Sequence, residues 1–142
     1  MLAEHPALIS APNSLGQVPL HYAVTYGAPE MVELLLAKGA DINVQDKTGL
    51  TPLHSAVIIG KGDEAELLIR RGADLERKDL FGDTPLHLAA LHGQDEMVAL
   101  LLRYGAALNA VNARGETPLD VARKYHKQET VQLLASRENM DD

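Results

Sequence analysis

The tetrapeptide Thr51-Pro52-Leu53-His54 occurs again, unchanged, at Thr84-Pro85-Leu86-His87, 33 residues further along the chain. Related tetrapeptides stand at Val18–His21, one interval earlier, and at Thr117–Asp120, one interval later. The sequence of 142 residues is therefore built on a period of 33 for most of its length. A fixed period of this size predicts a stack of similar units, each packed on its neighbours.

Other residues recur in the same register. A glycine precedes each proline of the motif by three residues, an alanine follows each by four, and three Gly-Ala pairs close the units. In chain order these residues are Gly16, Gly49, Gly82 and Gly115; Ala23, Ala56, Ala89 and Ala122; and Gly39-Ala40, Gly72-Ala73 and Gly105-Ala106. So many matches in one register exclude chance.

Each unit should contain two short helices. Thr51 is a suitable N-cap and Pro52 suits the first helical position, where its missing N–H costs nothing. A first helix is expected over 52–59, ended by a left-handed Gly60, and a second over 63–71. An extended loop or β-hairpin should follow. Helices of this length are marginal alone, so they depend on stacking.

This pattern resembles the ankyrin repeat, a 33-residue unit with T-P-L-H and a terminal L-L-x-x-G-A-D. The resemblance covers about residue 2 to residue 137 and implies an all-α solenoid of helix-turn-helix units with projecting loops. One domain is expected: a partial N-terminal repeat (1–12), three repeats (13–45, 46–78 and 79–111), a C-terminal capping repeat (112–137) and a frayed acidic tail (138–142).

The two ends of the stack differ. Residues 2–12 match the end of a repeat that lacks its T-P-L-H half, which leaves an apolar edge on the first full repeat. A native half-cap, a shortened chain, or a partner or second copy over this edge would each explain it, and we favour the first two and a monomer. At the other end, Asp120 replaces His, His126 replaces Gly, and polar residues suit a solvent-facing cap.

The first full repeat should be the weakest. Val18 stands where the other repeats have threonine, so its helix lacks a hydroxyl cap. Loss of such a cap costs about 0.5–2 kcal/mol.

Composition excludes several classes of function. The chain has 13 Lys+Arg against 20 Asp+Glu, a net charge of −7, which argues against binding to nucleic acid or an anionic membrane. It has no cysteine, so disulfides, thiolate metal sites and cysteine nucleophiles are excluded. We expect a cytoplasmic protein.

The histidines do not indicate a catalytic or metal site. His21, His54 and His87 share one repeat position, and packed helices lie about 8–10 Å apart, whereas a zinc ligand lies about 2.0–2.1 Å from its metal. The resemblance implies that these histidines join neighbouring loops. Known catalytic motifs are absent as well. We therefore expect no enzyme, no cofactor and no metal.

A smaller feature is the loop position after Gly-Ala. Asn43 and Asn109 occupy it in two repeats and Glu76 occupies it between them. A turn residue with a local side-chain hydrogen bond is expected at this position.

The resemblance implies a protein–protein interaction module that binds through its loop tips and the concave face of its first helices. Residues that vary between repeats are the candidates, because the repeating residues hold the stack. They are Phe81, Leu80, Leu50, Ile58, Ile59, Leu91, His92, Tyr26, Tyr104, Tyr125, Thr48 and Asp83. Phe81, the single phenylalanine, is the strongest candidate, because the repeat does not require it and aromatic residues often dominate interfaces.

Three alternatives stay open. Ile58 or Leu91 could pack inward, which would leave only the tip residues free. The chain could instead be a self-assembling or structural unit, or a fragment of a larger protein whose activity lies elsewhere. The sequence does not identify the partner protein.

Overall fold

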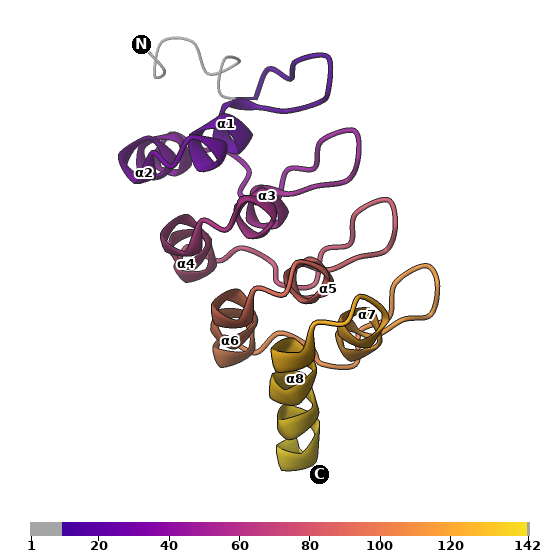
Figure 1. Cartoon of the computed structure of the whole chain (residues 1–142). Helices are drawn as coiled ribbons and strands as arrows, with labels where there is room; N and C mark the ends of the chain where they lie inside the picture. The colour runs from indigo at the N-terminus through magenta and orange to yellow at the C-terminus, as the bar shows by residue number, and fades with distance from the viewer. Residues whose placement is uncertain (1–9, 142) are drawn as a thin grey trace. The chain divides into compact units, whose positions relative to one another are not determined.

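The computed structural model describes residues 10–141 and shows eight helices joined by loops (Figure 1). They are α1 (Pro19–Thr25), α2 (Pro29–Ala37), α3 (Pro52–Ile59), α4 (Gly62–Arg70), α5 (Pro85–Leu91), α6 (Asp95–Arg103), α7 (Pro118–Lys124) and α8 (Gln128–Asp141). No strand occurs within residues 10–141, so the projecting segments are loops rather than β-hairpins. The predicted all-α fold is confirmed. Most of the expected partial repeat lies outside the described residues.

The first helix of each repeat begins at the predicted cap. At α3, the Thr51 hydroxyl accepts a hydrogen bond from the His54 amide at 3.3 Å, and the imidazole Nδ1 of His54 accepts one from the Thr51 amide at 3.1 Å. Such reciprocal bonds satisfy amides that a helix leaves unpaired at its start. At α1, Val18 donates its amide to His21 Nδ1 at 3.1 Å, but it has no hydroxyl to offer in return.

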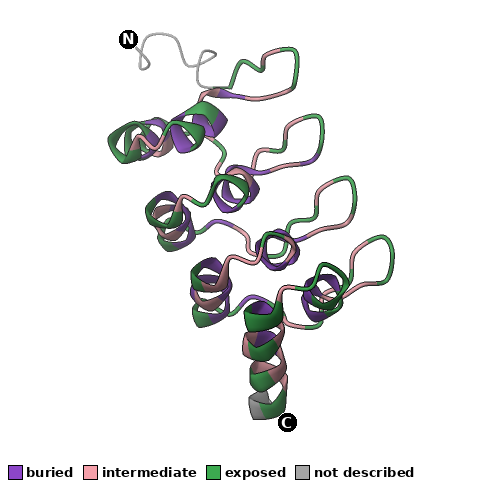
Figure 2. Cartoon of the chain, viewed as in Figure 1, coloured by how far each residue is buried: buried purple, intermediate pink, exposed green. Residues whose placement is uncertain are grey.

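The chain divides into two compact units, Met1–Asp74 and Leu75–Asp142, which we call unit 1 and unit 2. In unit 1, α1 packs against α2 and α3, and α4 packs against α2 and α3. In unit 2, α5, α6, α7 and α8 make the equivalent contacts. Every helix contributes buried residues (Figure 2). The largest buried side chains are Leu20, Leu35, Leu53 and Leu68 in unit 1 and Leu86, Leu101 and Leu134 in unit 2.

The projecting loops share one arrangement. A side-chain Oδ1 accepts hydrogen bonds from the amides two and four residues further on, all at 2.9–3.0 Å. The residues that supply this oxygen are Asn13, Asp46, Asp79 and Asn112. Side-chain bonds of this kind stabilise tight turns, so the loop tips are held without any strand.

Buried histidines join neighbouring loops, as the resemblance implied. The Nε2 of His21 lies 3.0 Å from the Leu50 carbonyl oxygen, and that of His87 lies 2.8 Å from the Glu116 carbonyl oxygen. Because Nδ1 of His87 accepts the Thr84 amide, Nε2 carries the hydrogen and donates it to the carbonyl. Each of these two rings therefore holds the loop of the repeat that follows its own.

Two expectations about smaller features are wrong. Asn43 does not bond locally: its Oδ1 accepts the amide of Asp74, 31 residues away, at 2.8 Å. Glu76, one repeat later, accepts the Ala107 amide at 2.9 Å, so its longer side chain makes the equivalent hydrogen bond to the next repeat. The tail predicted to fray from residue 138 is helical through Asp141, because α8 continues without the glycine that follows the other second helices.

Candidate functional site

Unit 2 contains a surface groove with a volume of about 180 Å³. Its walls come from the loop tips at 79–83 and 112–116 and from α5 and α7. The groove brings together four of the predicted residues, Phe81, Asp83, Leu91 and Tyr125. The other lining residues are His87, Asn112, Arg114, Glu116 and Val121.

Phe81 is held rigidly by its backbone while its side chain stays exposed. Its amide donates to Asp79 Oδ1 at 2.9 Å, and its carbonyl accepts the Ala113 amide of the next loop at 3.0 Å. The whole residue is 66% exposed. An aromatic side chain on a fixed backbone loses little conformational entropy when a partner covers it.

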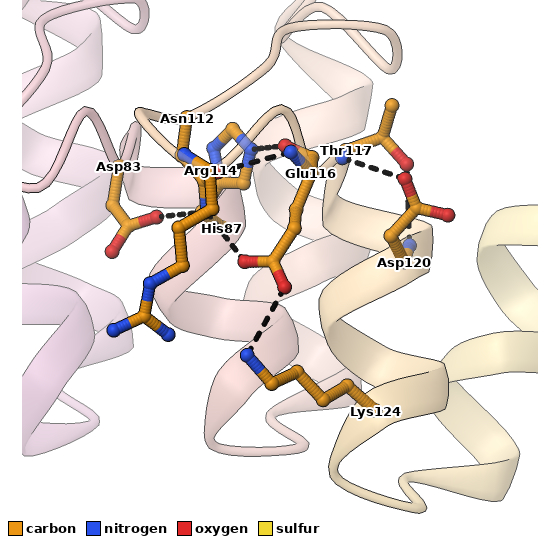
Figure 3. A network of polar contacts seen from close by, with 8 residues as sticks. All are labelled: Asp83, His87, Asn112, Arg114, Glu116, Thr117, Asp120 and Lys124. Carbon is orange, nitrogen blue, oxygen red and sulfur yellow. Dashed lines mark hydrogen bonds and ion pairs between the residues drawn. The ribbon is translucent and has the colours of Figure 1, made fainter.

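A network of polar contacts lines one wall of the groove (Figure 3). The Asn112 side-chain amide donates to Asp83 Oδ1 and to Glu116 Oε1, both at 3.0 Å. Lys124 Nζ donates to Glu116 Oε2 at 3.2 Å and lies 5.6 Å from the centre of the Tyr125 ring. The hydrogen bond from Asn112, followed by that from Lys124, holds the pKa of the Glu116 carboxyl below its ordinary value.

The other candidates of unit 2 do not line this groove. Leu80 is 70% exposed at the loop tip, beside Phe81. His92 is exposed at the end of α5, and Tyr104 is exposed at the end of α6. Leu91 itself is only half-buried, so it contributes both to the packing of α5 and to the groove.

The remaining candidates lie in unit 1. Ile58 and Ile59 are exposed at the end of α3, and Leu50 is half-buried. Thr48 donates its hydroxyl to Asp46 Oδ1 at 2.7 Å, so this side chain stabilises its own loop. Tyr26 is exposed, and its ring stacks on that of Tyr22 with centres 6.5 Å apart.

Sequence reasoning missed part of the groove. Asn112, which bridges the two carboxylates, was not among the candidates, because it occupies a recurring loop position that holds Asn or Asp in every repeat. Arg114, Glu116 and Lys124 also vary between repeats, so the same criterion points to them, although they were not among the twelve candidates. Tyr22 could have been found from its spacing of four residues from Tyr26 on one helix.

Within residues 10–141, no three His, Asp or Glu side chains gather in a way that could hold a metal ion. In the same residues, no helix has the length and apolar character needed to cross a membrane.

Comparison with known proteins agrees with this architecture. One family model, described as ankyrin repeats (3 copies), matches residues 60–142, and another, described as ankyrin repeats (many copies), matches residues 1–56. No curated protein matches the chain. Ankyrin repeats are generally protein–protein interaction modules and are typically non-catalytic. The chain belongs to the ankyrin repeat family.

Proposed function

We propose that this chain is a non-catalytic interaction module that binds another protein through the groove of unit 2 and the loop tips beside it. The observation that carries the proposal is Phe81, an exposed aromatic residue on a loop fixed at both backbone groups, at the edge of a groove. A repeat of this kind does not need an aromatic residue there, since the same position holds Leu15, Thr48 and Arg114 in the other repeats.

The composition of the groove supports this proposal. Phe81, Leu91 and Tyr125 supply apolar area, and Asp83, Glu116 and their partners supply a polar rim. Exposed apolar patches with polar rims are typical of binding surfaces, and aromatic residues near their centre often carry most of the affinity. Rigid presentation lowers the entropic cost of association.

Affinity capture with a matched pair of variants tests the proposal. The full chain and its Phe81→Glu and Leu15→Glu variants would be immobilised and exposed to lysate, and captured proteins identified by mass spectrometry. Leu15 occupies the same repeat position as Phe81 and is 61% exposed, but it lies in unit 1. Both variants should unfold in urea at the wild-type midpoint, because both side chains are exposed.

We expect the captured protein to bind Phe81→Glu at least tenfold more weakly, the loss typical of an interface aromatic. Leu15→Glu should bind like the wild type. Equal binding by wild type and Phe81→Glu would contradict the proposal.

A second candidate function is self-association through the first helix pair. Tyr22 and Met31 are exposed, whereas Leu88 and Met97, two repeats later at the same positions, are buried. Sedimentation equilibrium separates the two functions: we expect a monomer at micromolar concentration. A dimer that dissociates in a Tyr22→Lys, Met31→Lys variant would favour self-association.

A further inference from the structure

We infer that the groove of unit 2 takes an extended protein segment in which a bulky apolar side chain stands within a residue or two of an Asp or Glu. This inference rests on the proposed function, since it names the chemistry of the partner at the same site. The size of the groove, the pairing of its charges and the position of Arg114 carry it.

The size of the groove limits the occupant to about one large side chain. An internal cavity of about 150 Å³ holds one benzene molecule, and the groove has a volume of about 180 Å³. Phe81, Leu91, Val121 and Tyr125 supply its apolar lining. A leucine or aromatic side chain therefore fits, and its backbone would run along the open side.

The carboxylates of the groove already have partners. Asp83 and Glu116 both accept hydrogen bonds from Asn112, and Glu116 also pairs with Lys124. A cationic side chain from a partner would have to compete with these bonds. The two carboxylates are thus poor candidates for the main charged contact.

Arg114 differs from these residues. Its side chain is exposed, and its guanidinium makes no hydrogen bond or ion pair with any residue in the described range 10–141, although its charge helps to lower the pKa of Glu116. Figure 3 shows the guanidinium outside the dashed network that joins its neighbours. A guanidinium presents a planar fork of N–H donors that matches a carboxylate, so Arg114 selects an acidic group.

The loops hold this charge close to the apolar part of the groove. The Arg114 amide donates to Asn112 Oδ1 at 2.9 Å, and the preceding residue, Ala113, donates its amide to the Phe81 carbonyl at 3.0 Å. Lys78 Nζ adds another bond between the two repeats, to the Val111 carbonyl at 2.8 Å. The backbones that carry Phe81 and Arg114 are therefore fixed relative to each other, and the occupant must present its apolar and acidic groups together.

The net charge of −7 favours a different class of partner from the one that Arg114 selects, because it attracts basic proteins at long range. Long-range attraction is screened by salt within about 8 Å at physiological ionic strength, whereas a direct bidentate contact is screened less. Selection at physiological salt therefore reports the contact chemistry of the groove.

A random peptide library displayed on phage, selected against the full chain in physiological salt, tests the inference. Enriched peptides would be synthesised with a fluorescent label and titrated with wild type, Arg114→Gln, Phe81→Glu and Arg123→Gln. Arg123 is an exposed arginine of α7 that does not line the groove, so its variant is the matched control.

We expect enriched peptides to carry Asp or Glu next to a bulky apolar residue. Arg114→Gln should weaken their binding about tenfold, the effect of losing a charge-assisted hydrogen bond, and Arg123→Gln should not. Replacing the acidic residue of the peptide by its amide should remove the difference between wild type and Arg114→Gln, as expected for directly paired groups.

Two results would overturn the inference while leaving the proposed function intact: enrichment of Lys- or Arg-bearing peptides, or binding that is lost in Phe81→Glu but unchanged in Arg114→Gln. Binding unaffected by Phe81→Glu, or no enrichment over an unrelated protein, would contradict the groove as the binding site and with it the inference.

Discussion

Gly82 lies directly after Phe81, with φ of +79°, at a point where two loops nearly touch. A Cβ atom at this position would lie 2.4 Å from the backbone nitrogen of Ala113. Both the backbone conformation and the space therefore require glycine. This close approach allows the Ala113 amide to reach the Phe81 carbonyl, so the presentation of Phe81 depends on Gly82.

The substitution Gly82→Ala tests this dependence against a matched control. Gly115 has nearly the same φ, +76°, but a Cβ there meets nothing within 4 Å. Gly115→Ala should lower the free energy of unfolding by about 1–2 kcal/mol, the cost of the left-handed conformation. Gly82→Ala should lower it by about 1–3 kcal/mol more, because the loops must also separate. Urea unfolding measures both, and equal losses would contradict the contact.

His126 is the one residue other than glycine with positive φ in the described range, at 60°. The same repeat position is Gly27, Gly60 or Gly93 elsewhere. His126→Gly should therefore raise the free energy of unfolding by about 1 kcal/mol. This value is the strain that the left-handed conformation causes in histidine, reduced by the larger conformational entropy that glycine loses on folding. Gly93→His is the reciprocal variant and should be destabilising. A loss of stability in His126→Gly, measured by thermal unfolding, would show that its imidazole makes a compensating contact.

Glu116 supplies a prediction about pH. Its pKa lies below the ordinary value of 4.5 because Asn112 and Lys124 hydrogen-bond its carboxylate. Its contribution to stability is therefore complete above about pH 4.5 and is lost as the pH falls through the lower folded pKa. In a ¹³C NMR titration, Asn112→Ala should raise the Glu116 midpoint and Asn109→Ala, in an exposed loop position, should not. A wild-type midpoint at or above 4.5 would refute the network.

At the scale of the helix, α1 is the one first helix whose cap lacks a hydroxyl. Val18 is buried, as are Thr51 and Thr84 at the same position, and threonine has nearly the same shape. Val18→Thr should therefore stabilise the chain by about 0.5–2 kcal/mol and slow amide exchange in α1. Val18→Ala is the control, since it shortens the side chain without adding an acceptor, and it should destabilise. Unchanged amide exchange in Val18→Thr would mean that the missing hydroxyl cap does not limit the stability of α1.

The helices could largely be predicted from the sequence, because their starts depend on local chemistry. The Thr-Pro pair fixes the start of α3, and Gly60 in the left-handed conformation ends it, as expected. The extent of α8 was not predicted, since α2, α4 and α6 end near a glycine and no glycine follows Gln128. In the absence of this stop signal the helix continues to Asp141.

The groove could be predicted only in part. Phe81, Leu91 and Tyr125 were identified because apolar residues at variable positions stand out in a repeat. The hydrogen bond from Asn112 to Glu116 is local, but the one from Asn112 to Asp83 joins two loops 29 residues apart and depends on how they approach each other. Gly82 recurs in the repeat, but its close approach to Ala113 is set by packing and cannot be derived from the sequence pattern alone.

At the scale of the whole molecule, the residues that build the units and the residues proposed to bind form separate sets. Buried leucines recur at Leu20, Leu53, Leu86 and Leu119, and buried histidines at His21, His54 and His87. By contrast, Leu15, Thr48, Phe81 and Arg114 share one tip position and have different chemistry. The repeating residues account for the fold, and a fold alone does not specify a function. Function therefore has to be tested at the variable positions, Phe81 first.

Because Phe81 is the only phenylalanine, incorporation of 4-fluorophenylalanine gives the chain a single ¹⁹F reporter at the centre of the proposed site. The most direct measurement is the ¹⁹F NMR spectrum of this protein during titration with the protein it captures from lysate. We expect the single resonance to shift or broaden in proportion to the fraction bound. A partner that binds, as judged by co-elution, while the resonance stays unchanged would show that Phe81 is not part of the binding site.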